Sequence, residues 1–326
     1  MSKITKPQSN DDILFDKKKI YESLEKNGIF KDDKNSFKYW SGDEDNEVMY
    51  IAKIKENDVN FLGILNLDFE REGYCLNKYK NGDIYFGYYS KNKRDKHGLY
   101  QFKSEILDEE KLTEFYYGLW NNDIRDNHGV FLWLREPKNK KMFSNFDESN
   151  FQAYVGLVKN DNFLKGTYLS KEGDEYHVYH GTFNEDREKE GEKCFLYSAT
   201  LEQCFFGKFK NDEFVEGYVA LYDNEGNVKD ILKYKDGKKI SEEEIDKEEV
   251  KKLAEIFFNF RNIIMNKDYF GEIYNGFKKI VEFRDKKMDK LKILNSNEYL
   301  DILTNCINYN KMSIFNDIEN FVDYEE

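Results

Sequence analysis

The motif of an aromatic residue, any residue and then glycine occurs six times between Phe61 and Gly217. Each occurrence is closed by a second glycine 10 or 11 positions later. Successive first glycines are 24, 31, 38, 25 and 26 residues apart, so the chain carries an internal repeat. A unit this short cannot bury an apolar face alone, so neighbouring units must stack into an array. The pairs are Gly63/Gly73, Gly87/Gly98, Gly118/Gly129, Gly156/Gly166, Gly181/Gly191 and Gly207/Gly217.

Side-chain alternation within each unit predicts a β-hairpin, because successive strand residues point to opposite faces of a sheet. Glycine normally weakens a strand, but here it leaves space that a neighbouring aromatic ring can cover. We therefore predict one groove-forming face on which glycines and aromatic rings alternate. Its members are Tyr85, Gly87, Tyr89, Gly98, Tyr116, Gly118, Trp120, Gly129, Tyr154, Gly156, Gly166, Tyr168, Gly181, Phe183, Gly207 and Phe209, and alternation also assigns Phe195 and Tyr197 to it.

Residues 61–240 resemble MORN repeats (membrane occupation and recognition nexus). The resemblance rests on Tyr85-Phe86-Gly87-Tyr88-Tyr89 with His97-Gly98-Leu99-Tyr100, on Tyr116-Tyr117-Gly118-Leu119-Trp120 with His128-Gly129-Val130-Phe131, and on Gly166-Thr167-Tyr168. The units here vary in length, and the second glycine of the usual Gly-x-Gly pair is mostly replaced, as near Asp95 and Asp126. The resemblance implies a twisted sheet of antiparallel hairpins whose aromatic groove receives a helix. It also implies a scaffold role in cilia, cell division or the cortical cytoskeleton.

The segments on either side of the repeats complete the expected architecture, which is mainly β with α. The sequence predicts that residues 1–35 form a tail and a short helix over about 13–27. It predicts that residues 36–240 form the hairpin sheet, which begins with a leading hairpin of segments 37–40 and 48–54. Residues 241–326 read as a helical bundle whose first helix has a Ser241/Glu244 capping box. We expect these helices to cover part of the face that holds Tyr89, Trp120, Phe183 and Phe209.

Two long intervals between repeats hold inserted segments, at about 104–111 and 135–150. Insertions in a repeat array fall outside the stacked units and are often the places where partners bind. Neutral drift of surface loops explains them equally well, and the sequence does not choose between the two.

Charge and cysteine content narrow the partners and the compartment. A formal charge of −13 repels nucleic acid and anionic lipid, so we expect protein partners, with membrane lipid ranked second and nucleic acid excluded. Four scattered cysteines indicate reduced thiols, and the chain has no secretory signal pattern and no 18-residue apolar stretch. These features predict a cytoplasmic protein.

Residues suited to catalysis, cofactor binding or metal binding do not form a recognisable pattern. The sequence has no glycine-rich phosphate loop and no nucleophile elbow. His177 and His180 are three residues apart on a predicted strand, which places them on opposite faces and prevents shared metal ligation. Cys194 and Cys204 are interpreted as buried small apolar residues. We therefore predict a non-enzyme without cofactor or metal.

One helix, over about 269–294, combines an apolar side with many lysines. Lys279, Lys286, Lys287 and Lys290 form a candidate basic interaction face. Such a helix can lie on a membrane or dock on an acidic partner such as tubulin, but an ordinary helix with an apolar buried side and solvated lysines fits the same pattern.

Together these features predict a non-catalytic scaffold, a subunit of a cytoskeletal or ciliary (axonemal) assembly that is microtubule-associated. The alternative function is a phospholipid-binding or membrane-tethering adaptor.

Overall fold

A computed structural model describes residues 36–41, 48–56, 59–66, 68–240, 247–265 and 268–288 of the 326-residue chain. The predicted helix over 13–27, the Ser241/Glu244 cap and the predicted helices after 288 lie outside these residues. The described chain is mainly β, with two helices, and its strands form antiparallel sheet as predicted. It divides into two compact units, an N-terminal unit (residues 36–127 with 276–288) and a C-terminal unit (residues 128–275).

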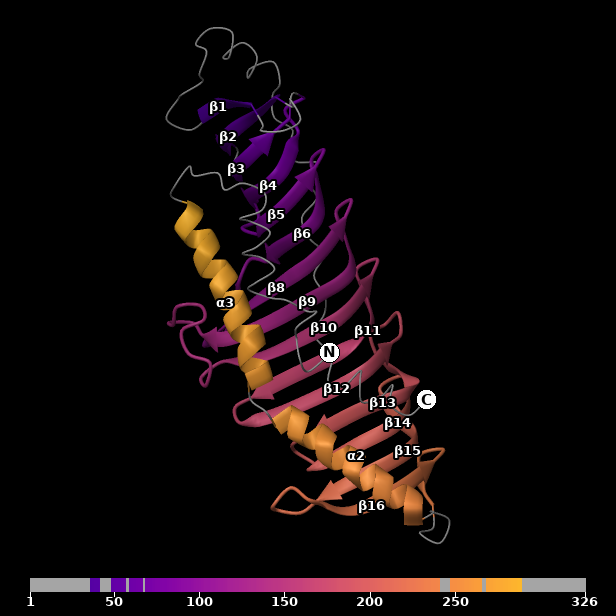
Figure 1. Cartoon of the computed structure of the whole chain (residues 1–326). Helices are drawn as coiled ribbons and strands as arrows, with labels where there is room; N and C mark the ends of the chain where they lie inside the picture. Colours follow the sequence, from indigo (N-terminus) through magenta and orange to yellow (C-terminus); the bar gives the residue numbers. More distant parts are fainter. Residues whose placement is uncertain are drawn as a thin grey trace. The chain divides into compact units, whose positions relative to one another are not determined.

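In the N-terminal unit each strand pairs with the next along the chain, except that β6 pairs with β8 rather than with β7 (Figure 1). The long strand β8 pairs with β7 at its beginning and with β6 further on. The predicted leading hairpin is confirmed as the pair β1–β2. The strands are β1 (Ser36–Ser41), β2 (Val48–Glu56), β3 (Val59–Leu65), β4 (Arg71–Lys78), β5 (Ile84–Ser90), β6 (Lys93–Gln101), β7 (Glu105–Leu107) and β8 (Glu110–Asn121).

The C-terminal unit follows the same plan, with every strand antiparallel to the next. Strand β9 (Ile124–Pro137) pairs with β10, and its first residues belong to the N-terminal unit. The remaining strands are β10 (Asn150–Lys159), β11 (Asn162–Glu172), β12 (Glu175–Phe183), β13 (Lys189–Ser198), β14 (Gln203–Lys210), β15 (Glu213–Tyr222), β16 (Val228–Lys235) and β17 (Lys238–Lys239).

Two-residue turns connect the two strands in four of the repeat units, and both residues of each turn have positive φ. In the turn Asn122-Asp123, for example, φ is 49° and 73°. Such pairs are typical of type I′ turns, whose twist matches that of the flanking strands, and asparagine and aspartate adopt this conformation more readily than most residues. The others are Lys91-Asn92, Asn160-Asp161 and Asn211-Asp212.

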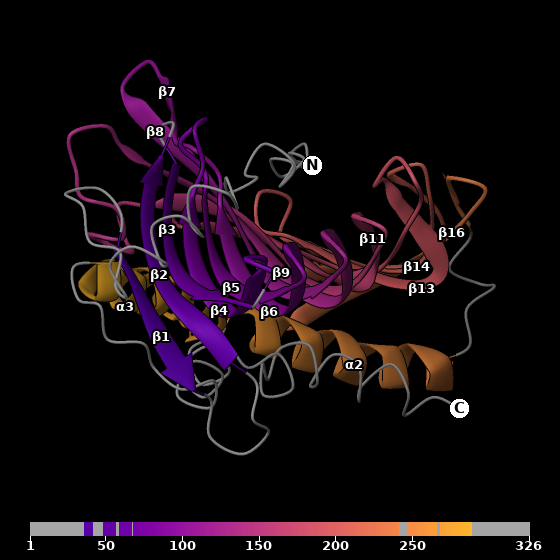
Figure 2. The same ribbon diagram turned by 90° about the horizontal axis from the view of Figure 1, so that it is seen from above.

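Two helices follow the strands, α2 (Lys247–Met265) and α3 (Asp268–Met288). Residues 268–275 of α3 belong to the C-terminal unit, and the rest of the helix belongs to the N-terminal unit. Figure 2 shows that the strands of each unit are bent and that the helix in each unit lies on the outer side of the bend.

The helices pack on the face opposite to the predicted groove, which corrects the expected packing. In the N-terminal unit, Phe283 of α3 contacts Phe86, with ring centroids 6.0 Å apart, and Phe277 contacts Phe115 at 5.5 Å. Phe86 lies between Tyr85 and Gly87 in sequence, so its side chain points away from theirs. Both faces carry rings, so hydrophobicity alone did not reveal which face the helices select.

A second correction concerns β13, where the pairing register shifts between Gly191 and Cys194. Gly191 has a φ of +143°, a conformation that favours glycine and accommodates an extra residue in the strand. The bulge reverses the alternation predicted from Gly191. Cys194 therefore lies beside Gly181, whereas Phe195 contacts Phe260 of α2, with ring centroids 4.6 Å apart.

Candidate functional site

Glycines of neighbouring strands lie opposite one another on the inner side of each bent sheet. In the N-terminal unit Gly98 is opposite Gly87 on one side and Gly118 on the other. A Cβ atom added to Gly98 would lie 2.6 Å from Cε2 of Tyr85, closer than real Cβ contacts come. The glycines therefore let aromatic rings lie flat against the backbone. The C-terminal unit has two such rows, Gly156/Gly166/Gly181 and Gly207/Gly217.

Tyrosine opens four of the repeat units, and Tyr85, Tyr154 and Tyr179 lie close to the glycine two residues later. Each tyrosine hydroxyl donates a hydrogen bond to the carbonyl oxygen three residues after it. This contact repeats in both units and fixes each ring over its glycine. The bonds are Tyr85 to Tyr88 (3.0 Å), Tyr116 to Leu119 (2.8 Å), Tyr154 to Leu157 (2.7 Å) and Tyr179 to Thr182 (2.9 Å).

A basic residue near the start of a returning strand joins one repeat to the next. Arg94 Nε and its backbone N–H both donate to Asp123 Oδ1, each at 2.9 Å. Arg71 makes the same pair of contacts with Asn92, at 3.2 and 2.9 Å. Asn92 and Asp123 are the second residues of type I′ turns. The turn of one repeat therefore accepts hydrogen bonds from the basic residue of the preceding repeat. Lys189 and Asp212 repeat this arrangement in the C-terminal unit.

Arg94 lies seven residues after the first glycine of its repeat. Other repeats have phenylalanine at this position, and its ring packs on the inner aromatic rings. Phe163 stacks on Tyr154, with ring centroids 3.8 Å apart and ring planes 9° apart. The basic residues also lie over rings, with the Arg94 guanidinium 4.8 Å from the Trp120 ring centroid and that of Arg71 4.7 Å from the Tyr89 centroid. A flat apolar or cationic group therefore fits this position equally well.

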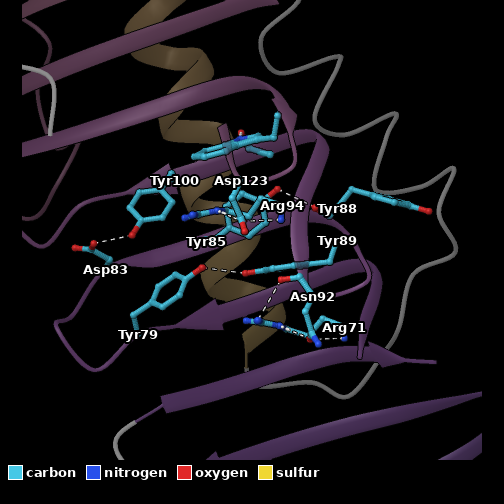
Figure 3. Close-up of polar contacts among 12 residues, drawn as sticks. Arg71, Tyr79, Asp83, Tyr85, Tyr88, Tyr89, Asn92, Arg94, Tyr100 and Asp123 are labelled. Carbon is cyan, nitrogen blue, oxygen red and sulfur yellow. Dashed lines mark hydrogen bonds and ion pairs between the residues drawn. The ribbon is translucent and has the colours of Figure 1, made fainter. Parts of the chain in front are cut away.

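Hydroxyl and carboxylate groups complete a buried polar cluster in the N-terminal unit (Figure 3). Tyr79 and Tyr89 share a hydrogen bond between their hydroxyls, at 3.0 Å, and Tyr100 donates to Asp83 at 2.7 Å. Asp83 also accepts the backbone N–H of Lys103 at 2.8 Å. The tyrosine and aspartate side chains of this cluster are almost fully buried.

Burial sets the protonation states of this cluster. It raises the pKa of Tyr85 and of Tyr89 well above 10, so both phenols are neutral at physiological pH. Burial alone would lower the pKa of Arg94, but Tyr79, Tyr89 and Asp123 outweigh it and raise the pKa above its ordinary value. The arginine therefore stays charged, and the cluster acts as a fixed structural support.

The buried cysteines are also protonated. Cys75, Cys194 and Cys204 are buried free thiols, as predicted for Cys194 and Cys204. Burial raises the pKa of Cys75 to about 12 and raises that of Cys194. A thiol in this state is a poor nucleophile and a poor metal ligand.

The two neighbouring histidines lie in different environments, in agreement with the predicted opposite faces. His180 is 1% exposed, and its Nδ1 shares a hydrogen bond of 2.9 Å with the Thr167 hydroxyl. Burial and, to a lesser degree, Lys165 lower the pKa of His180 to about 3. His177 is partly exposed and lies 3.8 Å from the Glu175 carboxylate.

The inserted segment at 104–111 forms a hairpin with an apolar, exposed end. Its β7 residues pair with the beginning of β8, and the side chains of Ile106 and Leu107 are 67% and 54% exposed. Carboxylates of Glu105, Glu109 and Glu110 are exposed on the same hairpin. An apolar tip with an acidic border is a chemically distinct surface.

The other inserted segment folds against its own unit. Lys171 is 1% exposed and donates to the backbone oxygen of Ser149 at 2.9 Å. Glu136 accepts the backbone N–H of Phe143 at 2.8 Å, and the Phe143 ring lies 5.1 Å from that of Tyr274 in α3. The segment is therefore anchored by two buried polar side chains and by a helix.

The candidate basic face of α3 presents both signs of charge where it is described. Lys279 and Lys286 are exposed, but Glu282 and Asp285 are exposed with them. The apolar side of the helix is buried in the N-terminal unit, where Arg284 donates to Gln101 at 2.7 Å. The side chain of Lys287 and the whole of Lys290 lie outside the described residues.

Sequence reasoning missed the residues that join the repeats, Arg71, Arg94 and Lys189. A signal was present, because Arg94 and Arg125 both follow the first glycine of their unit by seven residues, and Arg71 and Lys189 follow theirs by eight. The turn residues Asn92, Asp123 and Asp212 each lie five residues after the first glycine. Reading the repeats in register, position by position, would have found both sets.

The described residues contain no group of three or more side chains able to hold a metal ion, and neither described helix has the length and apolarity needed to cross a membrane. No protein-family model matches the sequence, and no curated protein matches it significantly.

Proposed function

We propose that this protein is a divergent MORN-type scaffold, a non-catalytic subunit that holds protein partners in a cytoskeletal or ciliary assembly. The exposed apolar end of the β7–β8 hairpin is the observation that carries the proposal. Ile106 and Leu107 are 67% and 54% exposed, whereas most large apolar side chains of the repeats are buried. Exposed neighbouring apolar residues bordered by charges are typical of protein-binding surfaces.

The repeat strands fix the position of this hairpin. Its strand β8 continues into the glycine row, where Gly118 pairs with Gly98 and the Tyr116 hydroxyl binds the backbone. Arg94 and Asp123 then connect β6 to the turn after β8. A binding element built on an ordered strand loses little conformational entropy when a partner docks.

The hairpin also indicates the chemistry of its partner. Ile106 and Leu107 are consecutive in β7 and point to opposite faces of the hairpin, so a partner that encloses the hairpin would contact both, and Glu105, Glu109 and Glu110 would face basic residues of that partner. A protein surface of this kind fits the proposal better than nucleic acid does, since carboxylates repel phosphates. The cytoplasmic location and the microtubule association that we propose rest on the resemblance to MORN repeats.

Quantitative affinity purification with crosslinking tests the proposal. The full-length protein is compared with an Ile106→Asp/Leu107→Asp variant, which removes the apolar end without touching the buried core. Leu201→Asp is the matched control, because Leu201 is 57% exposed on a different turn. We expect crosslinks from the hairpin to defined cytoskeletal proteins, lost in the double variant and kept in the control. Partner sets that are identical for all three proteins would refute a role for the hairpin.

A phospholipid-binding adaptor is the second candidate, favoured by the exposed Lys279 and Lys286 of α3. Because the apolar side of α3 is buried, its contact with lipid would involve headgroups alone. Liposome co-sedimentation separates the two functions. Strong, salt-sensitive binding to anionic vesicles, lost in Lys279→Glu/Lys286→Glu, would favour the adaptor over the scaffold.

A further inference from the structure

Strand β7 has an open edge in the N-terminal unit. Among the described residues it pairs with the beginning of β8 alone, and its residues Glu105, Ile106 and Leu107 are all exposed. Figure 2 shows β7 and the beginning of β8 projecting beyond the other strands of this unit. An exposed edge strand presents backbone N–H and C=O groups that a further strand can pair with.

The two-residue turn of this hairpin fixes which backbone groups face the open edge. Leu107 and Glu110 flank the turn and lie opposite each other. A pair that flanks such a turn exchanges backbone hydrogen bonds, and pairs of this kind alternate along the ladder with pairs that do not. Ile106, opposite Lys111, therefore belongs to the second kind. Its N–H and C=O point away from β8, towards the open edge.

Ser104 extends the same edge. Continuing the register of β7 places it opposite Thr113, and the hydroxyls of these two residues share a hydrogen bond of 2.7 Å. Ser104 is two positions from Ile106, so alternation gives its backbone groups the same direction. Two residues therefore direct a donor and an acceptor each towards the edge, at the spacing that an antiparallel strand matches.

Side chains of the hairpin restrict what can occupy this edge. Ile106 and Leu107 point to opposite faces and are 67% and 54% exposed, so an added strand would cover apolar surface on both faces. Residues 104–112 carry four carboxylates and one ammonium group, that of Lys111. A second copy of β7 would bring the same acidic groups and be repelled, whereas a basic strand would be attracted.

We propose that β7 binds a basic, extended segment of a partner protein as an additional antiparallel strand. The partner residue opposite Ile106 exchanges two backbone hydrogen bonds with it and has its side chain on the same face. The neighbouring partner residues lie opposite Glu105 and Leu107, which favours a basic residue at the first position and an apolar one at the second. This binding mode rests on the proposed role of the hairpin in partner binding.

An acetylated, amidated peptide of sequence Lys-Val-Val-Lys-Thr supplies this pattern, with its second valine opposite Ile106 and its second lysine opposite Glu105. The full-length protein, deuterated and labelled with ¹⁵N-isoleucine, is titrated with the peptide, and Ile106→Val assigns the Ile106 amide signal. We expect a saturable shift of that signal, because the Ile106 N–H gains an acceptor. The signal of Ile231, in the C-terminal unit, should stay unchanged.

Two N-methylated peptides with the same side chains separate strand addition from side-chain contact. A methyl group on the nitrogen of the second valine removes the N–H that would donate to the Ile106 carbonyl oxygen, so binding should weaken about tenfold or more. A methyl group on the nitrogen of the second lysine lies on the far edge of the added strand. That peptide should bind within about twofold of the unmethylated one.

Absence of a shift with the unmethylated peptide, or equal binding of the two methylated peptides, would overturn the proposal. An Ile106 signal that shifts with protein concentration alone would identify a second copy as the occupant and would also overturn it. The partner comparison with Ile106→Asp/Leu107→Asp is a separate measurement. Partners lost in that variant while the peptides fail would refute strand addition and leave the scaffold function standing; peptide binding with unchanged partner sets would refute the role of the hairpin in the scaffold.

Discussion

Replacement of Gly156 by alanine tests the packing of rings on glycines most sharply. The added Cβ would lie 2.6 Å from Cα of Gly166 and 2.7 Å from the Tyr154 hydroxyl, and it would also meet the Lys165 carbonyl oxygen. Ordinary contacts of this kind are nearer 3.4–4 Å. The Tyr154 ring must therefore move, and its hydroxyl loses the hydrogen bond that its single proton shares between the carbonyl oxygens of Leu157 (2.7 Å) and Lys165 (2.9 Å).

The expected loss of stability follows from these contacts. The shared hydrogen bond contributes about 1 kcal/mol, and overpacking costs about 1–3 kcal/mol. Alanine returns about 0.4–1 kcal/mol by restricting the unfolded chain. The free energy of unfolding should therefore fall by about 1–3.5 kcal/mol.

Urea denaturation followed by circular dichroism measures this change. Gly271→Ala is the matched control in the same unit, because the nearest atom to its new Cβ is Asn275 Nδ2 at 3.9 Å and the residue lies in α3. We expect that variant to be more stable by about 0.5–1 kcal/mol. Equal stability of Gly156→Ala and the wild type would refute the argument that the ring requires the glycine.

Two further predictions concern the polar contacts. Asp123→Gly should lower the free energy of unfolding by about 2–4 kcal/mol, because it leaves the buried Arg94 guanidinium without its carboxylate while glycine suits the φ of +73°. Asp123→Asn should cost less than about 1.5 kcal/mol, since Asn92 accepts the same hydrogen bonds from Arg71. Equal urea midpoints of the two variants would contradict this role of the carboxylate. The pKa of His180 is lowered to about 3 in the folded state. Between about pH 6.5 and that value, His180 is therefore protonated in the unfolded state but neutral in the folded state. The free energy of unfolding should fall by up to about 1.4 kcal/mol for each pH unit towards acid. Urea titrations between pH 5 and 7 should show this dependence weakened in His180→Gln and retained in His177→Gln; a dependence unchanged in His180→Gln would exclude His180 as its source.

The sequence was sufficient to predict the hairpins because glycine and aromatic residues recur in phase and alternate along each strand. It also indicated that Tyr85 and Gly87 share a face. The side chosen by the helices was not predictable from hydrophobicity, because Phe86 and Phe115 make the opposite face equally aromatic. The bulge at Gly191 changed the face of Phe195, since one extra residue reverses alternation from that point.

The contacts that join repeats depend on geometry that a single strand pattern does not contain. Arg94 meets Asp123 across a separation of 29 residues, and this pairing emerges only when two neighbouring repeats are aligned in space. The open edge of β7 likewise depends on the register between β7 and β8, which fixes the direction of the Ile106 backbone groups.

The central claim is that glycines of successive hairpins face one another across antiparallel strands. Nuclear Overhauser effects between glycine α-protons, measured on a deuterated protein with protonated glycine, test it most directly. Strong cross-strand signals should join Gly87 to Gly98, Gly156 to Gly166 and Gly207 to Gly217. Their absence, with these glycines assigned and showing helical or unpaired chemical shifts, would contradict the account.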